Sequence, residues 1–170
     1  MPTLKHMRTS HILLLGLMMA MPAVCHAQAK CPWINEATAS GILGGDVTLS
    51  ATVSDRGEGV CEFSRHHQDV VYQLHISVNI MSNIAKEFPT YIAQCPPPKT
   101  NPLRAVGNEA VICSIQEKGG TSAEMVVGRV RDQAFVVSIS SSLQENPSMT
   151  QEMRREKANR VAEQVAGILF

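Results

Sequence analysis

The feature that most constrains the fold is a series of apolar runs within residues 102–142. Val, Ile and Phe dominate these runs, and such residues suit the pleated, half-buried surface of a β-sheet. In the last run one face would carry Phe135, Val137 and Ile139, and the other Ala134, Val136, Ser138 and Ser140. This period of two predicts a strand with one strongly apolar face and one weaker face. We therefore expect three strands here, with a turn at residues 117–120.

Three more strands are predicted earlier in the chain, over residues 46–54, 59–65 and 70–80. The last of these alternates most clearly between apolar and polar residues. Its apolar face, which we expect to point to the core, carries Tyr72, Leu74, Ile76, Val78 and Ile80.

Two helices are predicted from apolar residues at helical spacing and from their end signals. The first spans residues 32–43, because Pro32 suits the first turn of a helix. The second follows an apolar stripe over residues 80–92, with Ser82 as its N-cap. Pro89 lies inside that stripe, so we expect a kink or a restart there.

A third helix is predicted over residues 148–169. Ser148 and Gln151 have the spacing of a capping box. Residues 154–157 are charged and are expected at the solvated end. The predicted buried stripe consists of Val161, Ala162, Val165, Ile168 and Leu169.

The resulting order is α-β-β-β-α-β-β-β-α. Strands that occur in runs, with helices segregated from them, indicate the α+β class. We expect an antiparallel sheet with helices packed on one face, held by two disulfides.

The N-terminus has the pattern of a secretory signal peptide over residues 1–29. A basic start precedes an apolar run, and Ala27 and Ala29 provide a small-x-small cleavage site. The run is shorter than the roughly 20 residues that a membrane-spanning helix needs. We expect a single exported domain over residues 30–170, in the periplasm or outside the cell, without stable membrane insertion.

The charge of the expected mature chain argues against nucleic-acid binding. The full chain has 15 Lys and Arg and 15 Asp and Glu, and removal of Lys5 and Arg8 leaves 13 − 15 = −2. No run of basic residues accompanies aromatic side chains. We therefore expect a protein or small-molecule partner and no nucleic acid.

The mature chain would keep four cysteines, Cys31, Cys61, Cys95 and Cys113. An even number in an exported chain indicates disulfides, and no metal-binding C-x-x-C spacing occurs. Four cysteines allow three connectivities. Because consecutive elements usually pack side by side, we predict the pairs Cys31–Cys61 and Cys95–Cys113.

Motifs for catalysis and for cofactor binding are absent from the sequence. It contains no G-x-S-x-G turn, no H-E-x-x-H helix and no phosphate-binding G-x-x-x-x-G-K-[ST] loop. We assign no catalytic, cofactor or metal residues, and expect no cofactor.

Three weaker groups of polar residues remain as candidates. A hairpin between the strands would bring His66, His67 and His75 near one another, but only one of the adjacent pair can share a face with His75. Glu109 lies in a Gly-Asn-Glu turn sequence, which a tight turn also explains. A third group, near a predicted hairpin tip, consists of Arg129, Arg131 and Asp132.

The chain resembles small exported bacterial domains of unknown function, including secreted lipoproteins and extracellular sensor domains of bacterial Ser/Thr kinases. The resemblance rests on PLRAVGNEA at residues 102–110, FVVSI at 135–139 and AEQVA at 162–166. It also includes the positions of Cys31 and Cys61. It implies the fold and an exported location, and carries over no catalytic residue. The chain departs from it in the extra cysteine pair and in lacking a lipid-attachment cysteine.

We therefore expect a non-catalytic exported module that binds a protein partner or a small ligand. One alternative is a metal-dependent protein or enzyme that uses the His66, His67 and His75 region. Another is a structural protein of the cell envelope.

Overall fold

The computed structural model describes residues 30–170, except for residues 98–99, 117–120 and 144–146. The predicted signal peptide and the predicted turn at residues 117–120 lie outside the described residues. The described elements are α1 (Glu36–Leu43), β1 (Thr48–Val53), β2 (Gly59–His67), β3 (Val70–Ile80), α2 (Ile84–Ile92), β4 (Asn101–Leu103), β5 (Glu109–Gln116), β6 (Ser122–Val130), β7 (Gln133–Ser141) and α3 (Gln151–Leu169).

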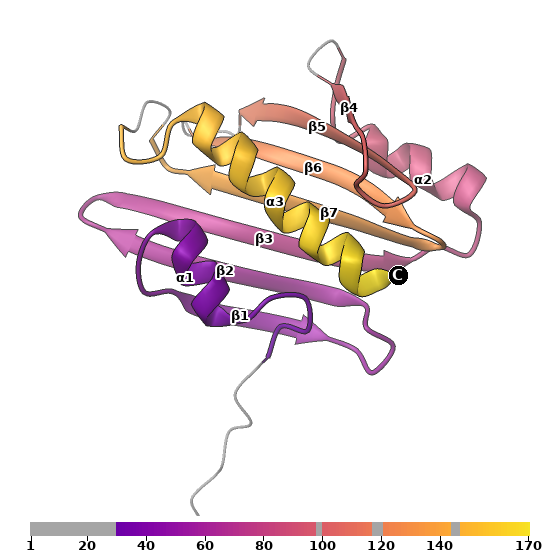
Figure 1. The fold of residues 1–170 in the computed structure, drawn as a ribbon, viewed down its shortest axis with the longest axis horizontal. Helices are drawn as coiled ribbons and strands as arrows, with labels where there is room; N and C mark the ends of the chain where they lie inside the picture. Colours follow the sequence, from indigo (N-terminus) through magenta and orange to yellow (C-terminus); the bar gives the residue numbers. More distant parts are fainter. Residues whose placement is uncertain (1–29, 98–99, 117–120, 144–146) are drawn as a thin grey trace, which may run out of the picture.

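The strands form one antiparallel sheet of seven strands in the order β1-β2-β3-β7-β6-β5-β4 (Figure 1). The chain builds one half of the sheet, passes through α2 to the opposite edge, and builds the other half inward. β3 and β7 therefore meet in the middle, where His75 lies opposite Ser138 and Ile76 lies opposite Val137. This central pairing joins the two halves of the chain.

Helices α1 and α3 lie in front of the sheet, on the face that we call the front face (Figure 1). The apolar residues of β3 that the sequence predicted to face the core are buried there, apart from the exposed Ile80. The main core packs these residues against Phe63, Phe135, Val137 and the stripe of α3. In that stripe Val165 is buried, whereas Ile168 at the end of the helix is 51% exposed.

Helix α2 packs on the opposite, back face, over β5, β6 and β7. Phe88 of α2 forms a second apolar cluster with Met125, Val127 and Val136, whose side chains point away from the main core. The predicted order and α+β class are confirmed, with the short β4 as an additional strand. The expectation of helices on one face holds for α1 and α3 and is wrong for α2.

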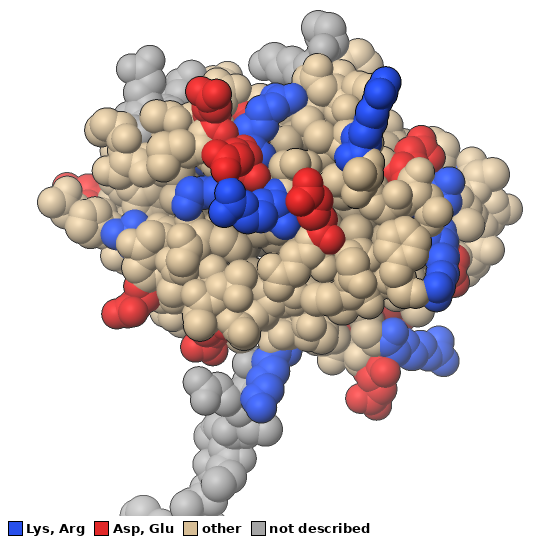
Figure 2. All heavy atoms as spheres, in the orientation of Figure 1, with Lys and Arg blue, Asp and Glu red and all other residues tan. Residues whose placement is uncertain are grey.

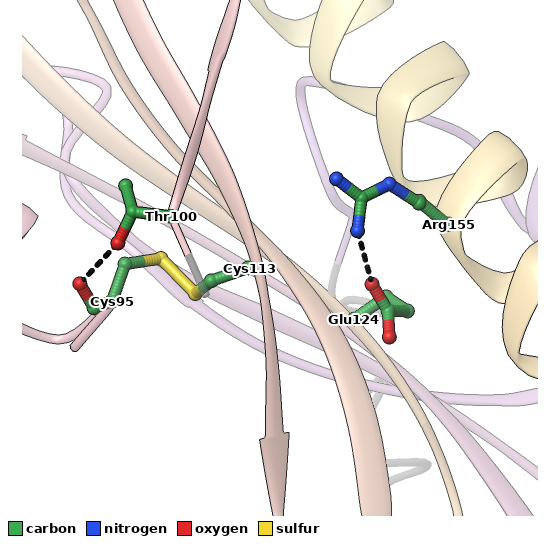
Figure 3. Close-up of a disulfide and its surroundings, with 5 residues drawn as sticks. All are labelled: Cys95, Thr100, Cys113, Glu124 and Arg155. Atoms are coloured by element: carbon green, nitrogen blue, oxygen red, sulfur yellow. Dashed lines mark hydrogen bonds and ion pairs between the residues drawn. A yellow bond between two sulfur atoms is a disulfide. The ribbon is translucent and has the colours of Figure 1, made fainter. Parts of the chain in front are cut away.

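Two disulfides attach one segment to each face of the sheet. Cys31 bonds to Cys61 on the front of β2, and Cys95 after α2 bonds to Cys113 on the back of β5 (Figure 3). Both predicted pairs are confirmed. The carbonyl of Cys95 also accepts a hydrogen bond from the Thr100 hydroxyl at 2.7 Å.

Helix α1 begins later than predicted. Asn35 is its N-cap, and the side-chain oxygen of Asn35 accepts a hydrogen bond from the backbone N–H of Thr38 at 2.8 Å. The preceding residues enter the core instead, since Trp33 is only 2% exposed. At the other end, Arg65 and Lys157 donate hydrogen bonds to the last carbonyl groups of the helix. Cations suit this end, because the helix dipole is negative there.

The caps of α2 and α3 also differ from the prediction. Asn83, rather than Ser82, caps α2. The helix continues through the exposed Pro89, so of the two outcomes expected there, a kink or a restart, the restart is wrong. Thr150, rather than Ser148, caps α3, with its hydroxyl accepting from the Met153 N–H. The predicted capping box is wrong because Gln151 turns toward the sheet, where it donates to Glu124. Among the described residues, no helix has the length and apolar character to cross a membrane.

Candidate functional site

The back face of the sheet is covered over only half of its width. Over β6, where α2 packs, both faces are buried. Over β3 burial alternates from Val71 to Asn79, with buried residues in front and half-buried residues behind. The residues of β3 that point to the back face begin with Val71. The others are polar, namely Gln73, His75, Ser77 and Asn79. The open half thus presents hydrogen-bonding side chains to solvent.

A groove of about 470 Å³ follows the line where the covered and open halves meet. β2 and β3 form its floor with β7, and Tyr91 of α2 and Gln94 just after it line its covered side. Its polar lining consists of Glu62, Gln73, His75, Ser77, Asn79, Tyr91, Gln94, Ser138 and Ser140, and its apolar lining of Ile115, Met125 and Val136. The volume falls within the usual range of small-molecule sites, roughly 300–1,000 Å³.

A row of three functional side chains crosses the floor of this groove. In the register of the sheet, His75 on β3 lies directly opposite Glu62 on β2 and Ser138 on β7. Residues paired in this way have Cβ atoms about 4.5–5.5 Å apart. Glu62 is held in place, since its Oε1 accepts a hydrogen bond from Gln73 Nε2 at 3.0 Å. The sheet therefore fixes a carboxylate, an imidazole and a hydroxyl in one line.

Tyr91 of α2 adds an aromatic ring to the covered side of the groove. Burial raises the pKa of its phenol above the ordinary value of 10.0, and Glu87 and Glu58 raise it further. The phenol is therefore protonated at neutral pH and available as a hydrogen-bond donor. Because Phe88 and the Cys95–Cys113 disulfide anchor α2, this side of the groove is held on a fixed element.

The described lining of the groove carries little charge. It contains no Lys or Arg, and Glu62 is its single carboxylate. The front face differs: Figure 2 shows Lys and Arg interspersed with Asp and Glu across it, without a large area of one sign. Neither arrangement resembles the basic surface that a nucleic acid requires.

The sheet register separates the three histidines that the sequence suggested as a group. His66 lies on β2 four residues beyond Glu62, the partner of His75, so about 13 Å of strand separates it from His75. His67 points to the other face. In the described ranges no three His, Cys, Asp or Glu residues are placed to hold a metal ion. Of the three histidines, only His75 lines the groove.

The other two candidate groups lie together at a hairpin end. Glu109 and Arg129 face each other across β5 and β6 and form an exposed ion pair at 3.3 Å. Asn108 accepts a hydrogen bond from the Arg131 N–H at 2.6 Å, while the exposed Asp132 lies in the turn. These contacts join two turns, and none of the five residues named here lines the groove.

A buried charged cluster under the start of α3 escaped the sequence reasoning. Arg154 was expected at the solvated end of the helix but is 1% exposed. It donates to the Ser122 hydroxyl at 2.8 Å and to the Met149 carbonyl at 2.7 Å. Glu124, also 1% exposed, lies 3.5 Å from Arg155 (Figure 3). The adjoining hollow of about 150 Å³ is too small for most ligands, so we interpret the cluster as structural.

No signal in single stretches of the sequence marks the groove, because its residues come from separate strands and from α2. Ser138 and Ser140 had been placed on the weaker face of their strand, and the structure puts them beside the polar side of β3. Neither a scan against protein-family models nor a search of curated proteins found a match to this chain.

Proposed function

We propose that this protein is a non-catalytic exported module that binds a small, uncharged, polyhydroxylated ligand of the saccharide type in the groove. The observation that carries the proposal is the convergence of side-chain amides, hydroxyl groups and Tyr91 on one groove beside a fixed helix. Small-molecule sites combine apolar and aromatic lining with a few placed polar groups.

The charges of the groove favour a neutral ligand. An anion would be left without a cationic partner on the described lining. A cation would find one carboxylate, Glu62, whose Oε1 is already engaged by Gln73. Hydroxyl groups both donate and accept, so they complement Gln73, Ser138 and Ser140 without requiring a counter-charge.

The construction of the site supports a preorganised groove rather than a peptide-binding edge. Its floor consists of inner strands, whose backbone groups are used in the sheet. An extended peptide could not add to such strands by backbone hydrogen bonds. Recognition must therefore use side chains.

The location of the protein is part of the proposal. Two disulfides are typical of proteins that fold in an oxidising compartment. Together with the signal-like N-terminus, they support a protein of the periplasm or the extracellular space, where soluble saccharides and cell-wall fragments occur.

Isothermal titration of the exported protein tests the proposal, with maltotriose, cellotriose and chitotriose as probes. We expect saturable binding of at least one probe. The Gln73→Leu and Ser138→Val variants should each weaken it by about tenfold or more, since each leaves ligand hydroxyl groups unpaired in the groove. Ser50→Val, on the exposed back of β1 outside the groove, is the matched control and should bind normally.

Two results would contradict the proposal. One is the absence of binding by any of the three probes at millimolar concentration. The other is binding that Gln73→Leu and Ser138→Val leave unchanged. In either case the structural envelope protein becomes the better interpretation.

The Glu62–His75–Ser138 row is the specific observation that favours a second candidate, an acyl-transfer enzyme. An acid, a histidine and a serine in line have the order of a nucleophilic triad. However, β7 lies between β3 and β6, so its backbone N–H groups are used in the sheet and offer no oxyanion hole at Ser138. Covalent labelling of Ser138 by a fluorophosphonate, lost in His75→Ala, would establish the enzyme; an unlabelled protein excludes a reactive serine.

A further inference from the structure

The groove has two unlike walls. Its open side carries the polar residues of β3 that point to the back face. Its covered side carries aliphatic side chains from neighbouring strands, Ile115 of β5, Met125 of β6 and Val136 of β7. A ligand hydroxyl group held against these side chains would lose its hydrogen bonds with water without replacing them. A saccharide that fills the groove therefore needs an apolar substituent on this side.

The apolar wall is accessible from the groove. Ile115 and Tyr91 are only partly buried against the second apolar cluster, so each offers apolar surface to a ligand. Met125 and Val136 are 5% and 6% exposed and form the base of the wall. An apolar group of the ligand would thus lie mainly against Ile115, with Met125 beneath it.

The sheet register places hydroxyl groups directly beside this wall. Ser138 of β7 lies opposite Met125 of β6, and residues paired in this way have Cβ atoms about 4.5–5.5 Å apart. In the next row, Ser140 lies opposite Ala123, which in turn lies opposite Ile115. The apolar substituent must therefore sit within reach of hydrogen-bonding groups.

Gln94 adds a side-chain amide at the same place. It is exposed, lines the groove and directly precedes Cys95. The disulfide partner of Cys95 is Cys113, which lies opposite Met125 in the sheet. The amide of Gln94 is thus held near the Met125 end of the wall. A side-chain amide both donates and accepts hydrogen bonds, so it complements another amide.

We propose that the groove selects neutral saccharides that carry an acetamido group. In this arrangement the methyl group contacts Ile115 and Met125, while the amide forms hydrogen bonds with Gln94 and Ser138. An acetamido group combines a methyl group with an adjacent donor and acceptor, and it has no charge that would require a Lys or Arg on the described lining. The inference rests on the proposed saccharide function and extends it by naming the substituent that the groove recognises.

Chitotriose and cellotriose test this inference, because they share the same linkage and differ in the acetamido group that replaces one hydroxyl group on each ring. Isothermal titration of the exported protein should give an affinity for chitotriose about tenfold or more above that for cellotriose. The methyl group gains apolar contact and the amide gains a hydrogen bond, and cellotriose has neither.

Two variants locate the source of this preference. Ile115→Thr removes apolar contact and Gln94→Leu removes the amide, so each should lower the ratio of chitotriose to cellotriose affinity by about threefold or more. Val111→Thr is the matched control. Val111 is likewise half-buried on the back of β5 but does not line the groove, so its substitution should leave the ratio unchanged. Circular dichroism should show all three variants to be folded.

The outcomes separate this inference from the proposed function. Cellotriose or maltotriose bound as tightly as chitotriose would overturn the inference and leave saccharide binding intact. A preference for chitotriose that neither Ile115→Thr nor Gln94→Leu reduces would also overturn it. A protein that binds none of these trisaccharides would contradict the proposed function, and the inference with it.

Discussion

The two halves of the sheet are built from similar parts but end with different surfaces. Each half has a set of antiparallel strands and one disulfide, with one helix in the first half and two in the second. In the first half the disulfide and α1 lie on the front face, and the back of β1 to β3 is left open. In the second half the disulfide and α2 lie on the back face, while α3 covers the front.

The second half of the sheet mainly stabilises the fold, whereas the first half carries the polar face that is open to solvent. The middle of the second half is buried on both faces, as the burial of β6 shows, with Val126 in the main core and Val127 in the second cluster. The first half is buried on one face, so its other face is free to carry polar residues. The groove lies where the two meet, and it needs both halves.

The largest expected effects come from removing the two disulfides separately. Each double Cys→Ser variant, at Cys31 with Cys61 or at Cys95 with Cys113, should lose about 3–4 kcal/mol of unfolding free energy, measured by urea denaturation. The effects on the groove should differ. Loss of Cys95–Cys113 releases the end of α2 and should abolish binding of the saccharide probe, whereas loss of Cys31–Cys61 should preserve it in the folded fraction. Equal effects on binding would show that α2 does not form the groove.

A neighbouring pair of residues on β3 sharpens the contrast between the two faces. Ile76→Ala should cost about 3 kcal/mol, because Ile76 is fully buried on the front face. Ser77→Ala, on the half-buried back, should change the free energy of unfolding by less than about 0.5 kcal/mol. Both values come from urea denaturation. A cost of 2 kcal/mol or more for Ser77→Ala would mean that something covers the open half.

Substitution of the buried Arg154 beneath α3 tests the second half of the sheet alone. Arg154→Met should destabilise the protein by about 2 kcal/mol, since it removes the hydrogen-bond donor of the buried Ser122 hydroxyl and of the Met149 carbonyl. Arg160→Met, at an exposed i,i+4 pair with Glu156, is the control and should cost less than about 0.5 kcal/mol. A neutral outcome for Arg154→Met would show that packing, rather than hydrogen bonding, holds this end of the helix.

The smallest predicted effect is a pH dependence where α1 meets α3. Burial lowers the pKa of Lys157 below its ordinary 10.5, Arg160 lowers it further, and Glu156 partly opposes them. At pH values between the lowered pKa of Lys157 in the folded protein and its ordinary pKa in the unfolded chain, the unfolded chain binds more protons than the folded one. Lys157 therefore makes the free energy of unfolding rise with pH until the lysine of the unfolded chain also loses its proton. Urea denaturation between about pH 8 and pH 10.5 should show a steeper rise for wild type than for Lys157→Met. Identical slopes would contradict the assignment.

Much of the scaffold could be predicted from local patterns. The alternation along β3 predicted the strand and its core face, and the position of the cysteines in consecutive elements predicted both disulfides. The face of the sheet on which α2 packs is set by tertiary contacts that local patterns do not reveal. One signal was nevertheless present in the sequence. Neighbouring residues of a strand point to opposite faces, so Cys113, next to the front-facing Ile112, points to the back face, and its disulfide with Cys95 places the end of α2 there.

The candidate site could not be predicted in the same way. The Glu62–His75–Ser138 row exists only because β3 pairs with β7, and that pairing joins residues far apart in sequence. The burial of Arg154 likewise depends on Ser122 and Glu124 of the sheet. A charged residue on a helix is exposed by default until its partners across the fold are known.

The most direct test of the central claim, that the open half of the back face forms the binding groove, is amide chemical-shift mapping of the isotope-labelled protein. Titration with the saccharide probe that binds should shift the amides of Gln73, His75, Ser138 and Gln94, and leave those of α1 and α3 in place. Shifts confined to the front face, or spread without relation to the groove, would contradict the account.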